Sequence, residues 1–521
     1  MSRAPWRSAI PAGAAALSSA GRAAVLAAGL LGAGLAGAGT ARAQVLEVAV
    51  DASPAGLDPH IATAFATFTV VNGTVYEGLT AIGEDLRVVP GLAQSWTTAE
   101  DGRTWRFTLR PGLRFHDGSA VTAEDVAASV RRVQSPAIAS PLASRLAAVQ
   151  AVRAVDAGTV EFSLSEASAP LAAALSGIAI VPRSAEADRE GLGRAPMGTG
   201  PFRFTEWQPN GYVLLSRNEN YWQAGLPKLA GIRFNIVPEA ATRLVGLNSG
   251  QYALLPGVDA ATAQQLRGRR AVTVHETLEL AYTLVGMNTS RPPFNDPKVR
   301  EALNFALNRQ EIVDAALFGA GVPGGPLSPA LREWALPVSE FPCYRPDPAR
   351  ARALLREAGI TTPIRVTMSV LPRQDIRDIA QVVQQQLNAV GFQVELRNQE
   401  LGQFIQDWRN SNFDLFASTN AGSVDPDDYF FRAFRTGGST NVFKYSDPAL
   451  DALLDRARTL GDQAARKAAY DEVQRRLACT GPVAHLAYPT LFTPARATLD
   501  GFEILANRSL ASLRSASLPA R

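Results

Sequence analysis

Apolar and polar residues alternate along several short segments in the first half of the chain, a pattern typical of half-buried β-strands. Residues 45–50 show this alternation, and residues 105–110 show it again with two aromatic residues on the same face. Residues 123–132 are predicted to form a helix, because Thr122 can cap the N-terminus and acidic residues follow in the first turn. Strands and helices therefore alternate from the beginning of the chain.

The alternation is clearest in the second half of the chain. Residues 375–390 carry an apolar stripe at helical spacing from Ile376 to Leu387, and Gly391 ends the helix. A further helix is predicted for residues 401–410, and strands are predicted for residues 364–370, 392–396 and 413–418. Strands joined by helices pair in parallel through right-handed crossovers. We therefore predict an α/β fold class.

The segment that follows the last of these strands is a candidate ligand-binding loop. In open parallel sheets, ligands bind beyond the carboxyl ends of the strands. The loop predicted at this position consists of Thr419, Asn420, Ala421, Gly422 and Ser423. The alternative interpretation is a plain surface connection, and the sequence alone does not choose between the two.

The first 43 residues have the composition of a secretory signal peptide. They contain four arginines and no acidic residue, followed by the apolar stretch 23–38 and the small residues around Arg42. The alternative, a membrane anchor, is disfavoured because a spanning helix needs about 20 apolar residues. We expect cleavage after Ala43 and a soluble periplasmic protein.

The charge of the chain does not favour nucleic-acid binding. The whole sequence has 51 basic and 48 acidic residues, a net charge of +3. Removal of the four arginines of residues 1–43 leaves 47 basic and 48 acidic residues, a net charge of −1. No basic run that could neutralise a phosphate backbone remains.

The motifs of common enzymes and metal sites are missing from the sequence. The four histidines are scattered, and no GxSxG, SxxK or HExxH motif is present. Two glycine-rich matches, 32–37 and 319–324, lack the strand or helix that phosphate binding requires. We expect no catalytic residues, no metal and no cofactor. The sequence leaves open whether Cys343 and Cys479 pair.

A series of short motifs, in order from about residue 46 to residue 503, resembles one protein family. The motifs include residues 57–60 (Leu-Asp-Pro-His), 90–96 (Pro-Gly-Leu-Ala-Gln-Ser-Trp), 115–118 (Phe-His-Asp-Gly), 198–202 (Gly-Thr-Gly-Pro-Phe), 218–222 (Asn-Glu-Asn-Tyr-Trp) and 293–296 (Pro-Phe-Asn-Asp). Together they are similar to the family 5 solute-binding proteins of ABC importers, which bind dipeptides, oligopeptides, nickel or glutathione. Most of these motifs have a structural interpretation, with His116 in a turn and His60 in a loop near the surface.

The resemblance implies a bilobal periplasmic-binding-protein fold with a hinge and an extra inserted domain. The first lobe would comprise residues 44–80, 195–283 and 491–521, the inserted domain residues 81–194, and the second lobe residues 284–490. A monomer of this kind captures a peptide-like or other small polar solute between its lobes. It delivers the solute to an ABC permease with its ATPase subunits.

The resemblance also places candidate ligand-binding residues, and two of them depart from the family pattern. Peptide-binding members have a Trp and an Asp where this chain has Thr419 and Gly422. Because the Asp holds the peptide's α-ammonium group, a ligand with a free α-amino group is in doubt unless Asp425, Asp427 or Asp428 takes over. We expect Asp425 and Asp427 to serve instead as turn and helix-cap residues.

Five further positions are predicted to line the binding cleft, namely Thr63, Ala64, Phe65, His485 and Tyr488. None of them carries a fixed charge, so the charge of the ligand stays open. Two alternatives to a peptide-like binder are also open from the residues alone. One is a secreted α/β hydrolase, and the other is a binder of metal chelates or haem on the same fold.

Overall fold

The computed structural model describes residues 44–519. The predicted signal peptide, residues 1–43, and the last two residues, 520–521, lie outside the described part. None of the described helices is long and apolar enough to cross a membrane.

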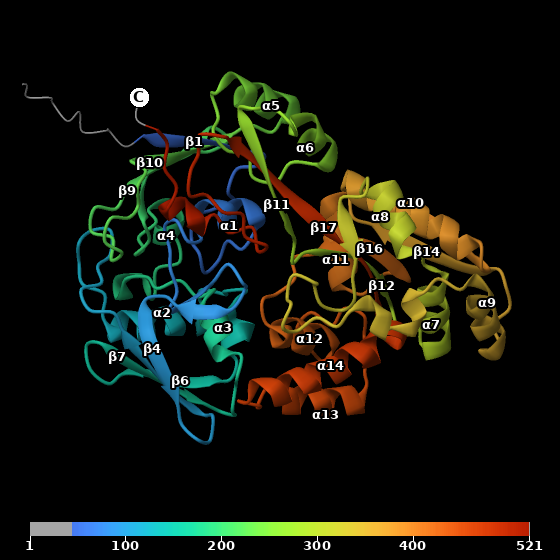
Figure 1. The fold of residues 1–521 in the computed structure, drawn as a ribbon. Coiled ribbons are helices and arrows are strands. Elements are labelled where there is room, and N and C mark those ends of the chain that lie inside the picture. The colour runs from blue at the N-terminus through green and yellow to red at the C-terminus, as the bar shows by residue number, and fades with distance from the viewer. Residues whose placement is uncertain (1–43, 520–521) are drawn as a thin grey trace, which may run out of the picture. The chain divides into compact units, whose positions relative to one another are not determined.

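Two four-stranded sheets are built from the first half of the chain (Figure 1). In the first, β1 (Val45–Val50) pairs in parallel with β10 (Gly231–Ile236), and β9 (Tyr212–Arg217) and β8 (Phe202–Gln208) follow as antiparallel neighbours. The second is wholly antiparallel, in the order β4 (Ala93–Thr98), β5 (Thr104–Leu109), β7 (Thr159–Leu164) and β6 (Val149–Ala154). A short hairpin joins β2 (Thr80–Ile82) and β3 (Val88–Pro90).

The helices that accompany these sheets are mostly short. Thr122 and Asp125 form the predicted cap of the longest one, with the Asp125 carboxylate accepting from the backbone N–H of Thr122 at 2.8 Å. The helices are α1 (Phe65–Val71), α2 (Ala123–Gln134), α3 (Leu171–Leu175), α4 (Gly191–Arg194), α5 (Ala240–Ser249) and α6 (Ala260–Leu266).

A seven-stranded mixed sheet dominates the second half of the chain. Its path is β11 (Val272–Leu278), β17 (Val483–Arg496), β12 (Tyr282–Met287), β16 (Leu415–Asn420), β14 (Ile364–Val370) and β15 (Phe392–Asn398), with β13 (Gly321–Pro323) paired to β17. The predicted parallel pairing is confirmed for β14 with β15 and with β16. The 14-residue β17 pairs with β12 at one end and with β11 at the other (Figure 1).

Helices cover both faces of this sheet because its strands are apolar on both sides. On β16, Leu415 and Ala417 join one buried cluster and Phe416 joins the other. The first cluster contains buried side chains of α7 (Pro297–Ala306), α8 (Arg309–Ala316), α9 (Pro348–Glu357) and α10 (Gln374–Asn388). The second contains buried side chains of α11 (Leu401–Arg409), α12 (Pro426–Phe434), α13 (Pro448–Ala457) and α14 (Gln463–Thr480).

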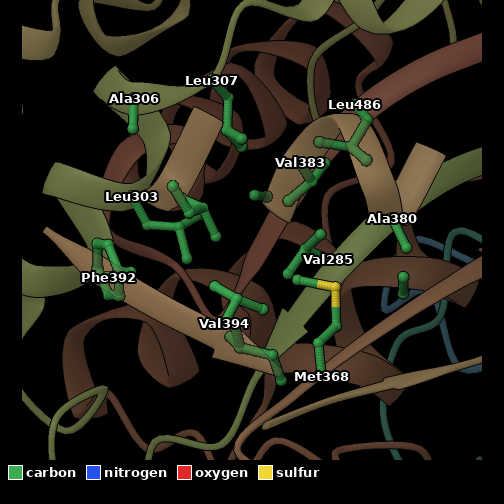
Figure 2. Close-up of a cluster of buried hydrophobic side chains, with 14 of the residues drawn as sticks. Val285, Leu303, Ala306, Leu307, Met368, Ala380, Val383, Phe392, Val394 and Leu486 are labelled. Carbon is green, nitrogen blue, oxygen red and sulfur yellow. The ribbon is translucent and has the colours of Figure 1, made fainter. Parts of the chain in front are cut away.

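Figure 2 shows how the first cluster fills the space between helices and sheet. Leu303 of α7 and Val383 of α10 meet Met368 of β14 and Val394 of β15, and all four side chains are at most 4% exposed. The predicted stripe of α10 from Ile376 to Leu387 is buried in this cluster and is thus confirmed. The α/β class predicted from periodicity follows from this alternation of buried faces.

The two cysteines, whose pairing the sequence left open, form a disulfide in the structure. Cys343 lies in the 3-10 turn Pro342–Tyr344, and Cys479 lies in the last turn of α14. The disulfide therefore ties the long irregular segment before α9 to the helix that covers the sheet.

A buried ion pair corrects the expectation that His60 lies in a loop near the surface. Arg132 of α2 is fully buried, and its guanidinium donates to both carboxylate oxygens of Asp58 at 2.6 and 3.2 Å. It also lies 3.1 Å from His60 Nδ1, while His60 Nε2 donates to the carbonyl of Ala179 at 2.9 Å. Burial lowers the pKa of His60 to about 4, so the neutral ring accepts from Arg132. The surface expectation was wrong because it ignored this partner from a distant helix.

We expect Asp58→Asn to lower the free energy of unfolding by about 3–5 kcal/mol, because it leaves the buried Arg132 without its counter-charge. Chemical denaturation would measure the loss. The matched control is Asp455→Asn, whose partner Arg435 is 2.8 Å away and whose pair is exposed. This control should change stability by about 1 kcal/mol or less. Equal losses in both variants would contradict the prediction.

Candidate functional site

Two adjoining cavities lie on either side of α1 and the segment that follows β16. Their volumes are about 380 and 830 Å³, which fall within the range of about 300–1,000 Å³ typical of small-ligand sites. Phe65 and Ala421 line both cavities and so mark the boundary between them. The smaller cavity is also lined by residues of the 142–147 and 168–177 segments and of α12.

The predicted residues before and in α1 lie at this boundary. Thr63 lines the smaller cavity, and Phe65, the first residue of α1, is 46% exposed between the two. The guanidinium of Arg508 lies 5.0 Å from the centre of the Phe65 ring. Ala64 is the exposed residue that precedes α1 and is not among the residues that line either cavity.

The predicted loop 419–423 is partly a strand. Thr419 and Asn420 belong to β16, because they pair with Thr283 and Tyr282 of β12, so the expectation of a loop was wrong at these two residues. Thr419, Asn420 and Ala421 line the larger cavity. The chain then turns, and Ala421, Gly422 and Ser423 line the smaller one. The end of β16 and the turn after it therefore line both cavities.

The backbone at Gly422 explains why no side chain stands there. Its φ is +72°, in the left-handed region that favours glycine. A Cβ atom at this position would lie 2.1 Å from the carbonyl oxygen of Leu280. The carboxylate that peptide-binding members have here could not be accommodated without displacing the backbone.

Tyr488 and His485 are buried in β17 rather than exposed to either cavity. Tyr488 is 1% exposed, and its hydroxyl donates to the carbonyl of Gly325 at 2.9 Å. His485 Nε2 shares a 2.7 Å hydrogen bond with the hydroxyl of Tyr429. Burial, with Arg309 nearby, lowers the pKa of His485 to about 3. His485 packs against Tyr429 of the helix that begins at Pro426, and Tyr488 packs against Tyr282 of β12.

The three acidic residues that could replace the missing carboxylate are already paired. Asp425 caps α12 and is held by both terminal nitrogens of Arg466 at 2.7 and 2.9 Å. Asp425 also accepts a hydrogen bond from the backbone N–H of Asp427, as predicted for a helix-cap residue. Asp427 and Asp428 are paired with other arginines.

Asp427 and Asp428 differ in their surroundings. Asp427 is 5% exposed, accepts from the hydroxyl of Tyr470 at 3.1 Å and lies 3.5 Å from Arg458. Burial raises its pKa to about 6. Asp428 lies 3.0 Å from Arg432, one turn further along α12, and also contacts Arg145. Its carboxylate is therefore shared between two guanidinium groups.

Sequence reasoning missed four charged residues that line the smaller cavity, namely Glu77, Arg145, Arg432 and Arg458. Glu77 accepts hydrogen bonds from the Tyr221 hydroxyl at 2.7 Å and from Trp222 Nε1 at 3.1 Å, and burial raises its pKa. The i,i+4 spacing of Asp428 and Arg432 could have indicated their pairing. No local pattern marks Arg145 or Arg458, since their partners are distant in sequence. Within residues 44–519, no cluster of three metal-ligating side chains is present.

Comparison with known proteins identifies the family. The sequence profile of the bacterial extracellular solute-binding proteins, family 5 Middle, matches residues 87–441. The chain belongs to this family. It is the solute-binding component of an ABC importer, as its motifs implied, and the alternatives of a hydrolase or a metal-chelate or haem binder are not favoured.

Relatives match over nearly the whole length. The glutathione-binding protein GsiB of Pectobacterium atrosepticum is 28% identical over 476 residues, 88% of this chain and 91% of its own. The dipeptide-binding protein of Escherichia coli is 26% identical over 499 residues, 89% of this chain and 92% of its own.

Solved structures confirm the bilobal fold. The oligopeptide-binding protein AppA of Bacillus subtilis, in complex with a nonapeptide, has a TM-score of 0.79 and 25% identity over 92% of this chain and 100% of its own. The ABC transporter substrate-binding protein CtaP of Listeria monocytogenes has a TM-score of 0.83 and 23% identity over the same shares.

We expect Gly422→Asp to destabilise the protein by about 1–3 kcal/mol, because the side chain meets both a positive φ and the Leu280 carbonyl. Gly112→Asp is the matched control, since Gly112 has a φ of +73° and no atom within 4 Å of its added Cβ. The control should lose less stability in thermal unfolding. Identical losses in the two variants would show that the Leu280 carbonyl does not constrain Gly422.

We expect stability to fall as the pH falls from about 6.5 toward 4, because His60, His116 and His485 all have lowered pKa values in the folded state. The unfolded chain binds these protons first, so acid favours unfolding. His485→Gln should make the fall less steep, as measured by the melting temperature at successive pH values. The raised pKa of Asp427 has the opposite effect on stability as the pH falls, but Asp427 is present in both the original protein and the His485→Gln variant.

The control for this comparison is His275→Gln, because His275 is only half-buried and its pKa is lowered less strongly. The slope of melting temperature against pH should change less in this variant than in His485→Gln. A His485→Gln protein with the slope of the original would contradict the assignment.

Proposed function

We propose that this protein binds a small peptide-like solute that lacks a free α-ammonium group. The observation that carries the proposal is that each carboxylate lining the smaller cavity already has hydrogen-bond or ion-pair partners within residues 44–519, including Glu77, which accepts from Tyr221, Trp222 and Thr199. Gly422 has no side chain, and its backbone disfavours one, while Asp425, Asp427 and Asp428 are paired with arginines. A buried ammonium group without a counter-charge costs several kcal/mol.

The peptide-like character is supported by the named relatives, which bind glutathione or dipeptides, and by the oligopeptide complex of AppA. The combined size and mixed lining of the two cavities suit a ligand larger than one amino acid. Thr63, Phe65 and the 419–423 segment would contact the ligand. Ala64, His485 and Tyr488 would act by supporting these residues or would reach the ligand only after a change of conformation.

The setting of the protein is part of the proposal. A signal peptide over residues 1–43 would bring a monomer to the periplasm, where it would deliver the solute to a permease driven by ATPase subunits. The division into a first lobe of three segments, an inserted domain at residues 81–194 and a second lobe at residues 284–490 would let a hinge close over the ligand. The site would bind its ligand and leave it chemically unchanged.

A thermal-shift screen of the purified protein tests the proposal. We expect N-acylated di- and tripeptides to raise the melting temperature more than the matched free-amino peptides, glutathione and sugars. A ligand at 100 times its Kd stabilises the folded state by about 2.7 kcal/mol. The largest shifts from free-amino peptides would contradict the interpretation of Gly422. Native mass spectrometry of protein purified from its host would identify a trapped ligand directly.

A further inference from the structure

Three guanidinium groups line the smaller cavity, and they come from different parts of the fold. Arg145 lies in the 3-10 turn Ala143–Leu146, Arg432 lies in α12, and Arg458 directly follows α13. Each guanidinium carries five N–H donors and no acceptor. The number of these donors that the protein itself uses determines which ligand groups the cavity can bind.

The guanidinium of Arg145 is only weakly satisfied by the protein. Its contacts with Asp428 are long, at 3.4 Å from Nε to Oδ1 and 3.4 Å from Nη2 to Oδ2. Asp428 is held more closely by Arg432, at 3.0 Å, and also accepts from the Ser423 hydroxyl at 3.0 Å. Arg145 thus has only a share in a carboxylate that already has a partner.

Arg458 also has unused donors. Its side chain is 14% exposed and reaches Glu166 at 3.3 Å and Asp427 at 3.5 Å. Its Nε atom is buried and has no hydrogen-bond partner among residues 44–519. The two terminal nitrogens have only these long contacts, so they keep donor capacity for a ligand acceptor. The Phe431 ring, 3.8 Å from the guanidinium carbon, fixes the plane of the group.

The acceptors of the cavity are, by contrast, in use. Asp425 is occupied by Arg466, Asp427 by Tyr470 and Arg458, and Asp428 by Arg432, Arg145 and Ser423. Glu77 accepts from the side chains of Tyr221, Trp222 and Thr199. The lining therefore offers a surplus of donors to a ligand and no carboxylate that is free of partners within the described chain.

We propose that the smaller cavity binds a carboxylate of the ligand, with Arg145 and Arg458 as its donors. The inference rests on the proposed function, which it deepens by naming an acidic peptide-like solute as the ligand class. The planar fork of a guanidinium matches the two oxygens of a carboxylate, and such charge-assisted pairs are among the strongest hydrogen bonds. Arg145 would then pair with the ligand's carboxylate and would no longer share the Asp428 carboxylate with Arg432.

The experiment compares ligands that differ only in this group. Isothermal titration would measure N-acetylated tripeptides as free acids and as C-terminal amides, and amidated tripeptides with one Asp or Glu side chain. Acetylated amino acids, opines and dicarboxylic acids complete the panel. We expect the acids to bind about 10- to 100-fold more tightly than the amides. The two kinds of acidic peptide distinguish a terminal carboxylate from a side-chain carboxylate.

The variant Arg145→Gln should weaken binding of the acids by about 10- to 100-fold and leave the amides within about threefold. Arg145→Lys keeps the charge without the fork and should fall between the two. Arg87→Gln is the matched control, because Arg87 also pairs with a residue distant in sequence, Glu333, but lines neither cavity. The control should bind both classes like the original protein.

Three outcomes would overturn the inference. They are equal binding of acids and amides by the original protein, equal weakening of both classes in Arg145→Gln, and the failure of every carboxylate in the panel to bind. Equal weakening would mean that Arg145 acts only by joining its segment to α12. Binding of non-peptide acids alone, with the expected dependence on Arg145, would refute the peptide-like ligand and support the carboxylate site.

Discussion

The backbone pairing of β17 holds the site residues in place. One end of this strand pairs with β12. The pairing of β12 with β16 in turn fixes the positions of Thr419 and Asn420. Its other end pairs with β11, and through Leu254 it reaches β1 of the first sheet. The segment after β16 and the first sheet, which precedes α1, are therefore both linked to one continuous strand, and small rotations about it would change the space between them.

The chemistry of the cavities follows from how charge is neutralised inside the protein. Carboxylates at the start of α12 cap and orient that helix only if arginines from elsewhere compensate them. Once they are compensated, they no longer attract a cation. The same pairing leaves guanidinium donors that the protein does not saturate. Structural neutralisation and the proposed ligand preference would thus be two results of one arrangement of charges.

The sequence predicts regular elements well and the partners of charged residues poorly. The stripe of α10 and the cap at Thr122 are local patterns, so their periodicity and spacing were sufficient. The two residues added to β16 depend on pairing with β12, which no local pattern shows. His60 was placed at the surface because its partner Arg132 lies on a helix far along the chain. For the same reason Arg145 and Arg458 were not recognised, whereas the departure from the family pattern at Gly422 pointed to a segment that lines both cavities.

The parallel pairing of β1 with β10 has a consequence for how the protein is made. Among the described residues, the first strand, Val45–Val50, pairs with Gly231–Ile236, and Val48 also bridges to Leu254, which in turn bridges to Ala495. Such distant contacts form late and slowly. A chain made from its N-terminus must hold this apolar first strand unpaired until β10, almost 200 residues later, has been made. An unpaired apolar strand is prone to aggregation during that interval.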